Sequence, residues 1–496
     1  MTLRTSRFGA CSALLLCAGI ALPTHAQTPS PLPSNLPAFC SSGGSTLCPT
    51  IPTSLLIPGL DYSGLTSNQT QFDNFSWQMF VALNWPADQN GKPVGTSLSA
   101  NPTAKRVWEY FPSTLDVFGG SPGGGCTNKS LPTFYSIAKS GSLTQAASQS
   151  GLADAMLSNL GTQAGKILQA TGEPLIDRNG NYVLYDIRVS PAEKAYIQSK
   201  GLTTQGGQQA FTGTIQFPAA SGSNSGAIEI KTAWRILPAP DSNYYSIKAQ
   251  ISLDGTETES GKPACLTVTL GLVGMHIVAK PSASYDYNAW TWTTFEHKDN
   301  APLAKDAPQP VDGQHPAPQV ACSAADAGSA TYSFYNPSCT KDGKPCALNE
   351  PPQKPLGGYR WNTSGPPYAP ARLLNDGKYG TQVARCWAVY QPTSELNAAW
   401  LKKLQEVDPK GPWKNYFVVS TQWVSSQVHG QTLTFDQRQV PRFVSNTTME
   451  TYIQKEGSCM SCHNMATDLA KKNSNFSFFL LNAVQGVQGG ASKARP

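Results

Sequence analysis

Charged residues are scarce in this 496-residue chain, in which Asp, Glu, Lys and Arg together make up only 14%. The 37 basic residues slightly outnumber the 31 acidic ones, and they form no Lys/Arg cluster of the kind that binds nucleic acid. We therefore expect no nucleic-acid partner. Glycine (43 residues) and proline (39 residues) are abundant instead, which favours a loop-rich exported protein over a helical bundle.

Long apolar runs are also rare. Beyond the N-terminus, no stretch reaches the roughly 20 apolar residues of a membrane-spanning helix, so the mature chain is expected to have no transmembrane segment. The N-terminus has a basic start, a short apolar run over residues 10–22 and a small residue, Ala26, where a signal peptidase would cleave. This order predicts a signal peptide over residues 1–26 and a periplasmic or secreted location. The Pro- and Ser-rich residues 27–52 are expected to form an extended linker.

Closely spaced cysteine pairs of the kind that bind zinc are missing, apart from one Cys-x-x-Cys at Cys459 and Cys462. A structural zinc site is therefore not expected. Of the 12 cysteines, Cys11 and Cys17 fall in the predicted signal peptide. The others form an even set, which predicts up to four disulfides in an oxidising compartment, with free buried thiols as the alternative: Cys40, Cys48, Cys126, Cys265, Cys322, Cys339, Cys346 and Cys386.

Two local disulfides can be predicted from spacing alone. Cys40–Cys48 and Cys339–Cys346 each close a short loop that contains Gly or Lys. The pairing of the remaining cysteines stays open, because many connectivities are compatible with one sequence.

The sequence Cys-Met-Ser-Cys-His at residues 459–463 is the attachment signature of a c-type haem. Cysteines at this spacing lie on one side of a helical turn, where both thiols can add to the vinyl groups on one edge of the porphyrin. His463 then lies under the iron as the proximal ligand. The single motif predicts one covalent haem c bound through Cys459, Cys462 and His463. The alternatives are a disulfide redox pair and a chance match.

The motif and three other segments resemble large bacterial proteins loosely called the cytochrome c family. These segments are residues 77–86 (WQMFVALNWP), 272–278 (LVGMHIV) and 292–300 (WTTFEHKDN). The resemblance extends over about residues 70–482. It implies a haem protein, but it implies no defined reaction and no catalytic residues.

A second axial ligand is missing from the C-terminal region. After His463 the only methionine is Met465, which is too close to reach the opposite face of the haem, and no histidine follows. A sixth ligand of the His or Met type must therefore come from upstream. We expect the large N-terminal region to cover the haem.

His276 is the first candidate for a distal iron ligand. The alternation of residues 266–278 predicts a strand that places His276 on one apolar face with Leu270 and Leu272, unless the glycines of this segment introduce a bulge. An unpaired imidazole is costly on such a face, and iron would provide a partner. A core histidine that is hydrogen-bonded to the backbone is the alternative.

His297 is the second candidate, as a distal-side or acid/base group. Glu296 and Asp299 flank it, which would raise its pKa. The alternative is a surface turn at a strand end. Met275 is expected to point away from His276, so only one of these two can face the haem. Met79 and Met156 are further candidates among the upstream methionines. Met449 is expected to be a core residue, His315 to be solvated and His429 to lie in a loop.

The periodicity along the chain predicts an α+β fold, with a mainly antiparallel sheet and peripheral helices. A main domain over residues 53–440 is expected to support a small C-terminal c-type haem segment over residues 441–496. The expected strands are 175–189 (a hairpin around Asn179-Gly180), 211–217, 227–237, 244–253, 266–278, 290–295 and 416–424. The expected helices are 75–85, one that begins after Ser190, 394–407 and one near 448–455.

These features together favour a periplasmic monohaem c-type cytochrome that exchanges electrons with a periplasmic redox partner protein. A haem-dependent oxidoreductase with an open distal site, similar to a peroxidase or an oxidase, is one alternative. A haem-based sensor or ligand-binding module is another. The roughly 400 residues upstream of the motif are more than a simple electron shuttle needs, and this keeps both alternatives open.

Overall fold

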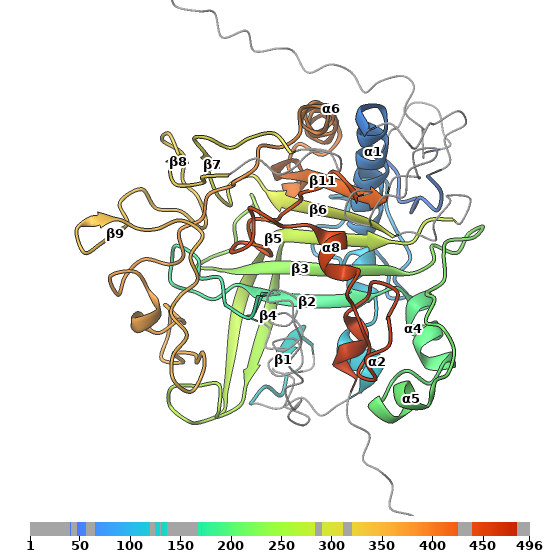
Figure 1. Ribbon diagram of the computed structural model, residues 1–496, viewed down its shortest axis with the longest axis horizontal. Helices are drawn as coiled ribbons and strands as arrows, with labels where there is room; N and C mark the ends of the chain where they lie inside the picture. The colour runs from blue at the N-terminus through green and yellow to red at the C-terminus, as the bar shows by residue number, and fades with distance from the viewer. Residues whose placement is uncertain are drawn as a thin grey trace, which may run out of the picture.

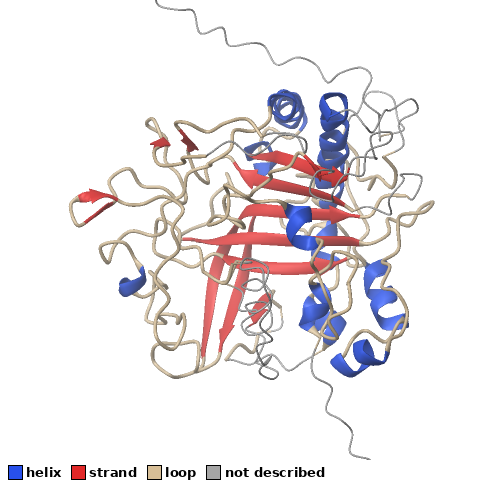
Figure 2. Cartoon of the chain, in the orientation of Figure 1, coloured by secondary structure: helices blue, strands red, loops and turns tan. Residues whose placement is uncertain are grey.

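The computed structural model describes residues 40, 47–55, 65–119, 125–128, 130–135, 167–169, 171–282, 290–310, 320–424 and 439–483. The predicted signal peptide, most of the predicted linker, Met156, His315 and His429 lie outside the described residues. The fold is α+β, as predicted, with a mainly antiparallel sheet and helices around it (Figures 1 and 2).

An eight-stranded sheet forms the centre of the described chain. Its longest strand, β5, is paired with β3 along one edge, while β4 and β6 pair in turn with its two halves along the other. Strand β2 extends the sheet beyond β3, and β11 and β12 extend it beyond β6. All these pairs are antiparallel, and only the short β1 joins in parallel, on β4. The bounds are β1 (Thr133–Tyr135), β2 (Leu184–Val189), β3 (Ile228–Leu237), β4 (Ser246–Leu253), β5 (Ala264–Ala279), β6 (Thr291–His297), β11 (Tyr416–Val424) and β12 (Gln439–Val440).

Helices α1 (Leu65–Leu83) and α6 (Gln391–Val407) pack on one face of this sheet. Trp77 of α1 stacks on Trp400 of α6 at 5.6 Å between ring centroids, and it meets Phe295 of β6 edge-on at 5.1 Å. Phe80 stacks on Phe295 at 4.2 Å. These fully buried rings explain the aromatic composition of residues 77–86, because they form the centre of the larger hydrophobic core.

The opposite face of the sheet carries the C-terminal segment. Its short helix α8 (Cys459–His463) lies over β3 and β5 in Figure 1. Beside it are short helices, α2 (Thr114–Phe118), α4 (Pro191–Ser199), α5 (Gln205–Ala210) and the 3-10 turn η4 (Phe479–Asn482). Helix α4 begins as predicted, because Ser190 accepts a hydrogen bond from Glu193 N and Pro191 occupies the first turn.

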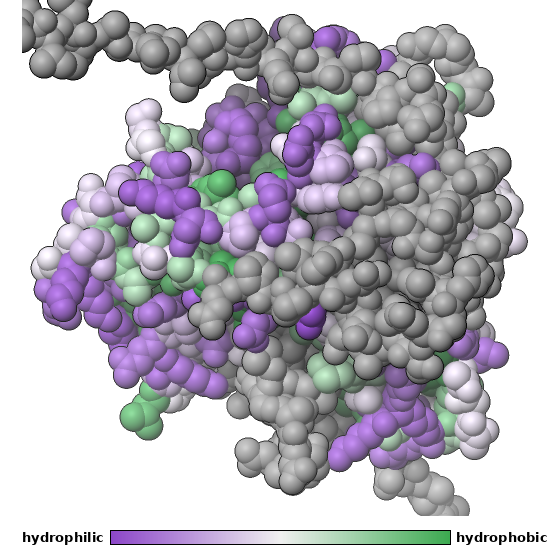
Figure 3. Space-filling model, turned by 45° about the horizontal axis from the view of Figure 1, so that its top comes forward, coloured by the Kyte–Doolittle hydropathy of each residue, from purple (hydrophilic) through white to green (hydrophobic). Residues whose placement is uncertain are grey.

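Residues 301–310 and 320–375 contain little regular structure and occupy the left side of Figure 2. They contain two small hairpins, β7 (Leu303–Ala304) with β8 (Ala325–Asp326) and β9 (Thr340–Lys341) with β10 (Lys344–Pro345). The remaining 3-10 turns are η1 (Val107–Tyr110), η2 (Ala371–Leu373) and η3 (Pro412–Asn415). On the face shown in Figure 3, hydrophilic side chains dominate this region, with small apolar patches between them.

Disulfides connect the cysteines that were predicted to pair. The local bridges Cys40–Cys48 and Cys339–Cys346 are confirmed, and the long-range pairs are Cys126–Cys265 and Cys322–Cys386. Such bonds persist in oxidising compartments, which is consistent with an exported protein. Among the described residues, even the longest helix, α1 with 19 residues, lacks the apolar length of a membrane span.

Three details of the predicted strands and helices were wrong. Residues 211–217 form no strand, and residues 448–455 form turns rather than a helix. The third is the face occupied by His276. The pairing of β3 with β5 slips by one residue, so that Val273 is left over as a bulge between Leu272 and Gly274. A bulge reverses the alternation beyond it.

The bulge therefore moves His276 off the face that Leu270 and Leu272 share. These two leucines belong to the large core together with Met275 and Ile277. His276 instead lies on the opposite face with Val278, which belongs to the smaller core around α8. Met275 points away from His276, as predicted.

Candidate haem-binding site

The motif helix α8 is fixed to strand β11 by one side chain. Gln422 accepts a hydrogen bond from Met460 N (2.8 Å) through its carbonyl oxygen and donates one to Ser458 Oγ (3.1 Å) through its amide nitrogen. Ser458 also caps the helix by accepting from Ser461 N. These bonds satisfy backbone donors that a short helix leaves unpaired, and they hold the motif against the sheet.

The imidazole of His463 is held in one tautomer. Its Nδ1 donates a hydrogen bond to the carbonyl oxygen of Phe476 at 2.7 Å, which leaves a lone pair on Nε2. The rings of Trp292 and Phe478 enclose it, at centroid distances of 5.6 and 5.1 Å. Metal-binding histidines in proteins are commonly oriented in this way, with the second ring nitrogen bonded to a carbonyl.

Burial dominates the electrostatics of His463. It lowers the pKa of the imidazole to about 4, and the charges of His276 and Lys231 act in the same direction. The hydrogen bond to Phe476 and the carboxylate of Glu450 oppose this shift. The ring is therefore neutral at physiological pH, which is the form that binds iron.

Cys459 and Cys462 are half-buried thiols without a disulfide, whereas every other described cysteine is paired. Burial raises the pKa of Cys462 to about 11 and that of Cys459 well above its usual range, and Glu450 adds to both shifts. Redox-active pairs need a thiol pKa near or below neutrality. The environment of these thiols therefore disfavours a thioredoxin-like role.

His276 lies on the same face of the sheet as the motif. Its Nε2 is buried and lies 3.4 Å from Glu450 Oε2, so that the two groups form an ion pair when the imidazole is protonated. Burial opposes ionisation of Glu450, but His276 and Lys231 outweigh it and lower the pKa of this carboxyl. A buried imidazole in contact with a carboxylate is typical of an acid/base group or of a histidine ligand that a carboxylate orients.

Lys231 completes a charged group on this face. It is directly opposite His276 in the register of β3 and β5, and its ammonium lies 5.2 Å from the ring centroid of Tyr185. Burial lowers its pKa, and Glu450 partly counteracts that shift.

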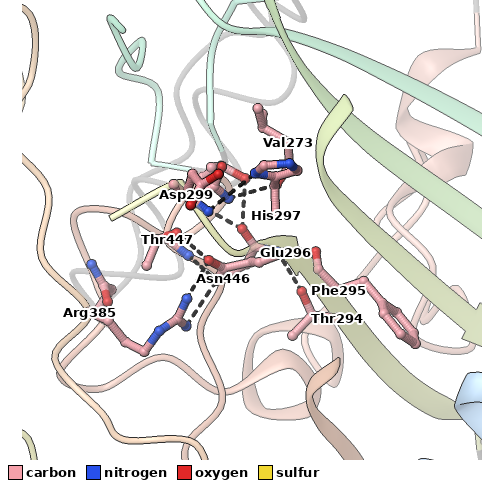
Figure 4. A network of polar contacts seen from close by, with 12 residues as sticks. Val273, Thr294, Phe295, Glu296, His297, Asp299, Arg385, Asn446 and Thr447 are labelled. Atoms are coloured by element: carbon pink, nitrogen blue, oxygen red, sulfur yellow. Dashed lines mark hydrogen bonds and ion pairs between the residues drawn. The ribbon is translucent and has the colours of Figure 1, made fainter. Parts of the chain in front are cut away.

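His297 has a different environment. Its Nε2 donates to the carbonyl of Asn243 (2.9 Å), its Nδ1 accepts from Asp299 N (3.2 Å), and its ring stacks on Tyr244 at 4.1 Å. Burial lowers its pKa to about 4, in contrast to the raised value expected from its acidic neighbours. Both ring nitrogens are therefore used within the protein (Figure 4).

Glu296, the neighbour of His297, joins the sheet to the segment before the motif. Its carboxylate forms two bonds with the guanidinium of Arg385, at 3.1 and 2.6 Å, and accepts hydrogen bonds from the backbone and hydroxyl of Thr447. Asn446 donates to Thr294 Oγ1 (2.7 Å) beside it. Figure 4 shows this network at the end of β6, where it holds residues 446–447 against the sheet.

All but one of the described methionines lie in apolar cores. Met79 and Met275 are part of the large core, and Met449 lies in another cluster with Tyr185 and Val273. Met465 is exposed beside the motif. Of the upstream candidates in the described part of the chain, the structure therefore brings His276 close to His463, while Met79, Met275 and Met449 are held in the apolar cores. No group of three or more His, Cys, Asp or Glu side chains in the described part of the chain could hold a metal ion.

The residues around the motif fit a c-type haem. They supply two free thiols on one turn, the His463 imidazole with its lone pair on Nε2, aromatic rings around it and a second imidazole, His276, that contacts Glu450. The comparisons identify no relative, because no protein-family model, curated protein or solved structure matches the chain.

A buried pair of carboxyl groups adjoins this site. Glu193 of α4 is fully buried, and both of its oxygens lack a hydrogen-bond donor. Burial and the adjacent Glu229 raise its pKa well above the usual range; burial also raises the pKa of Glu229, which is hydrogen-bonded to Glu193 and to Ser477. Two carboxyls in contact retain one proton between them.

Glu193→Gln is expected to stabilise the protein at pH 8 by about 1–3 kcal/mol and to have much less effect at pH 5. The pKa of Glu193 is higher in the folded protein than in the unfolded chain. The protonated pair therefore contributes to the free energy of unfolding at low pH, and this contribution is lost as the pH rises through the folded-state pKa. The glutamine amide can donate to Glu229 at any pH. Urea unfolding at both pH values measures the difference, with the exposed Glu395→Gln as the control. Equal effects of Glu193→Gln at the two pH values would refute a shared proton.

Sequence reasoning missed Lys231, Glu450, Gln422 and the carbonyl of Phe476. Lys231 and Gln422 reach the site through strand register, and Glu450 reaches it through a turn, so no local pattern in the chain marks them. The strand prediction for residues 227–237 could have raised interest in Lys231, because the alternation places it on one face with Glu229.

Proposed function

We propose that this chain binds one haem c covalently through Cys459 and Cys462, with His463 as the proximal iron ligand, and that it acts in electron transfer as an exported monohaem cytochrome. The observation that carries the proposal is the hydrogen bond from His463 Nδ1 to Phe476, which prepares Nε2 for iron beside two free thiols. The predicted signal peptide and the disulfides support maturation outside the cytoplasm, where c-type haem is attached and where a periplasmic redox partner protein would be met.

Electron transfer is favoured by the position of the motif. Cys459, Cys462 and His463 are half-buried, while Asn464 and Met465 beside them are exposed. A haem attached at these thiols would have its thioether edge close to the surface, where a partner protein can approach. The Phe476, Phe478 and Trp292 rings would cover the proximal side.

His276 is the best-placed residue for the sixth ligand. Its Nε2 lies 3.4 Å from Glu450 Oε2 on the motif side of the sheet, so Glu450 could orient this nitrogen while Nδ1 binds iron. His297 is less suitable, because both of its nitrogens are already bonded.

His276→Ala is expected to convert a low-spin ferric iron to a high-spin one and to allow the ferrous form to bind carbon monoxide. Absorption and electron paramagnetic resonance spectra of the haem-loaded protein measure both changes. His276→Met should restore a six-coordinate iron, and His297→Gln, which keeps a donor for Asn243, should leave the spectra as in the wild type. Unchanged spectra in His276→Ala would exclude His276 as a ligand.

A haem-dependent oxidoreductase is the second candidate. The cluster of Lys231, His276 and Glu450 favours it, since charged groups near an open iron can exchange protons with a bound substrate. A wild-type iron that is high-spin and binds carbon monoxide would support this candidate over electron transfer.

A further inference from the structure

The loop that holds His463 adopts an unfavourable backbone conformation. Asn475 and Phe476 have φ values of +53° and +71°, in the left-handed region that residues with a side chain rarely adopt. Such conformations are unfavourable and persist where surrounding contacts enforce them. The second of them, Phe476, supplies the carbonyl that accepts from His463 Nδ1.

Asn475 is fixed on all sides. Its Oδ1 accepts hydrogen bonds from Phe217 N and from the ammonium of Lys280, both at 3.1 Å. Its backbone carbonyl accepts from Trp290 Nε1 at 2.9 Å, and its backbone N–H donates to Asn473 Oδ1, also at 2.9 Å. These contacts explain how the left-handed conformation persists.

Lys280 is an unusual anchor, because its ammonium is almost entirely buried. The side chain is 1% exposed, and besides Asn475 it donates to the carbonyl of Phe217 at 2.8 Å. Lys280 follows directly after β5, the strand that carries His276. Burying an ammonium is costly, and the bonds to the loop offset part of that cost.

We propose that Lys280 and Asn475 are positioning residues for the proximal histidine: they hold the Phe476 carbonyl on His463 and thereby set the basicity of the imidazole. This inference rests on the proposed function. A histidine that donates to a well-placed carbonyl is a stronger donor to iron and stabilises the ferric form. Loosening the loop weakens the hydrogen bond from His463 Nδ1 to the Phe476 carbonyl. The imidazole then becomes a weaker donor to iron, so the reduction potential of the haem rises.

Two variants separate anchoring from backbone strain. Asn475→Gly keeps a residue that tolerates positive φ but removes the side-chain anchor, and Lys280→Met keeps the apolar stem but removes the ammonium. Asn475→Asp retains an acceptor for both donors and serves as the conservative rescue. The control is Lys472→Met, because the Lys472 ammonium also donates to backbone carbonyls, those of Gln208, Gln209 and Phe211, but not to Asn475 or Phe476.

All variants are expected to retain covalent haem. In Asn475→Gly and Lys280→Met, redox titration should show that the equilibrium between ferric and ferrous haem shifts about tenfold towards the ferrous state. This shift corresponds to a reduction potential that is higher by about 59 mV, because one electron is transferred. Their ferric electron paramagnetic resonance signals should broaden, because the imidazole loses its fixed orientation. Asn475→Asp and Lys472→Met should resemble the wild type. Potentials and signals that stay unchanged, or that shift equally in Lys472→Met, would overturn the inference.

The haem-free protein provides an independent readout. If the wild type carries no covalent haem, the proposed function fails, yet the loop can still be tested through the tautomer of His463. Nitrogen–proton couplings measured by NMR should show the Nδ1–H tautomer in the wild type and a mixture of tautomers in Asn475→Gly. The same tautomer in both proteins would contradict a positioning role.

Discussion

Replacing both Cys459 and Cys462 with serine is expected to abolish covalent haem attachment completely. The two thiols lie on one helical turn and are the described cysteines without a disulfide, so no nearby thiol can substitute. Each single variant should retain one thioether and a reduced yield of bound haem. Haem staining after denaturing electrophoresis, with the protein expressed together with a c-type maturation system, measures the attachment.

The matched control for this experiment also removes two cysteines. Cys339 and Cys346 form a disulfide across the small β9–β10 hairpin, which lies away from the sheet in Figure 1. Serine at both of these positions should leave haem staining unchanged. Staining that survives in the double variant Cys459→Ser/Cys462→Ser would show that the haem is attached elsewhere.

Glu296→Gln and Arg385→Met are each expected to lower the free energy of unfolding by about 3–5 kcal/mol. The pair is buried, with side-chain exposures of 9% for Arg385 and 0% for Glu296, so that removing one partner leaves the other charge uncompensated. Glu296 also holds Thr447, and its loss should therefore loosen the segment that leads to the motif. Urea unfolding followed by tryptophan fluorescence measures the change.

The exposed ion pair between Lys298 and Asp299 is the natural comparison. Its side chains are 52% and 33% exposed, and it lies only two residues further along the chain. Lys298→Met should change stability by less than about 1 kcal/mol, because solvent screens exposed pairs. Equal effects in the buried and exposed pairs would contradict the importance of burial.

Local patterns predicted most of the sheet and little of the site. Strand β11 was predicted to the residue, and β3 through β6 were predicted within a few residues, because alternation and turn residues mark them in the chain. The bulge at Val273 was not predictable in position, since it depends on how β3 pairs with β5. That one residue decides which face His276 occupies.

The site could be predicted only where its residues are contiguous. Cys459, Cys462 and His463 were visible from their spacing, but the groups that orient them come from distant strands and loops. Lys280 lies almost 200 residues before Asn475, and Gln422 reaches α8 from β11. For His297 the neighbours in sequence are misleading. Glu296 and Asp299 suggest a histidine with a raised pKa, whereas burial next to Asn243 and Tyr244 lowers the pKa and keeps the ring neutral.

The measurement that tests the central claim most directly is the mass and absorption spectrum of the wild-type protein, produced with a c-type maturation system and then denatured. We predict one haem per chain that remains bound after acid–acetone extraction, with a reduced spectrum typical of two thioether bonds and a peptide attached to haem that contains Cys459 and Cys462. A chain without covalent haem, or one in which these two cysteines are joined as a disulfide, would contradict the account.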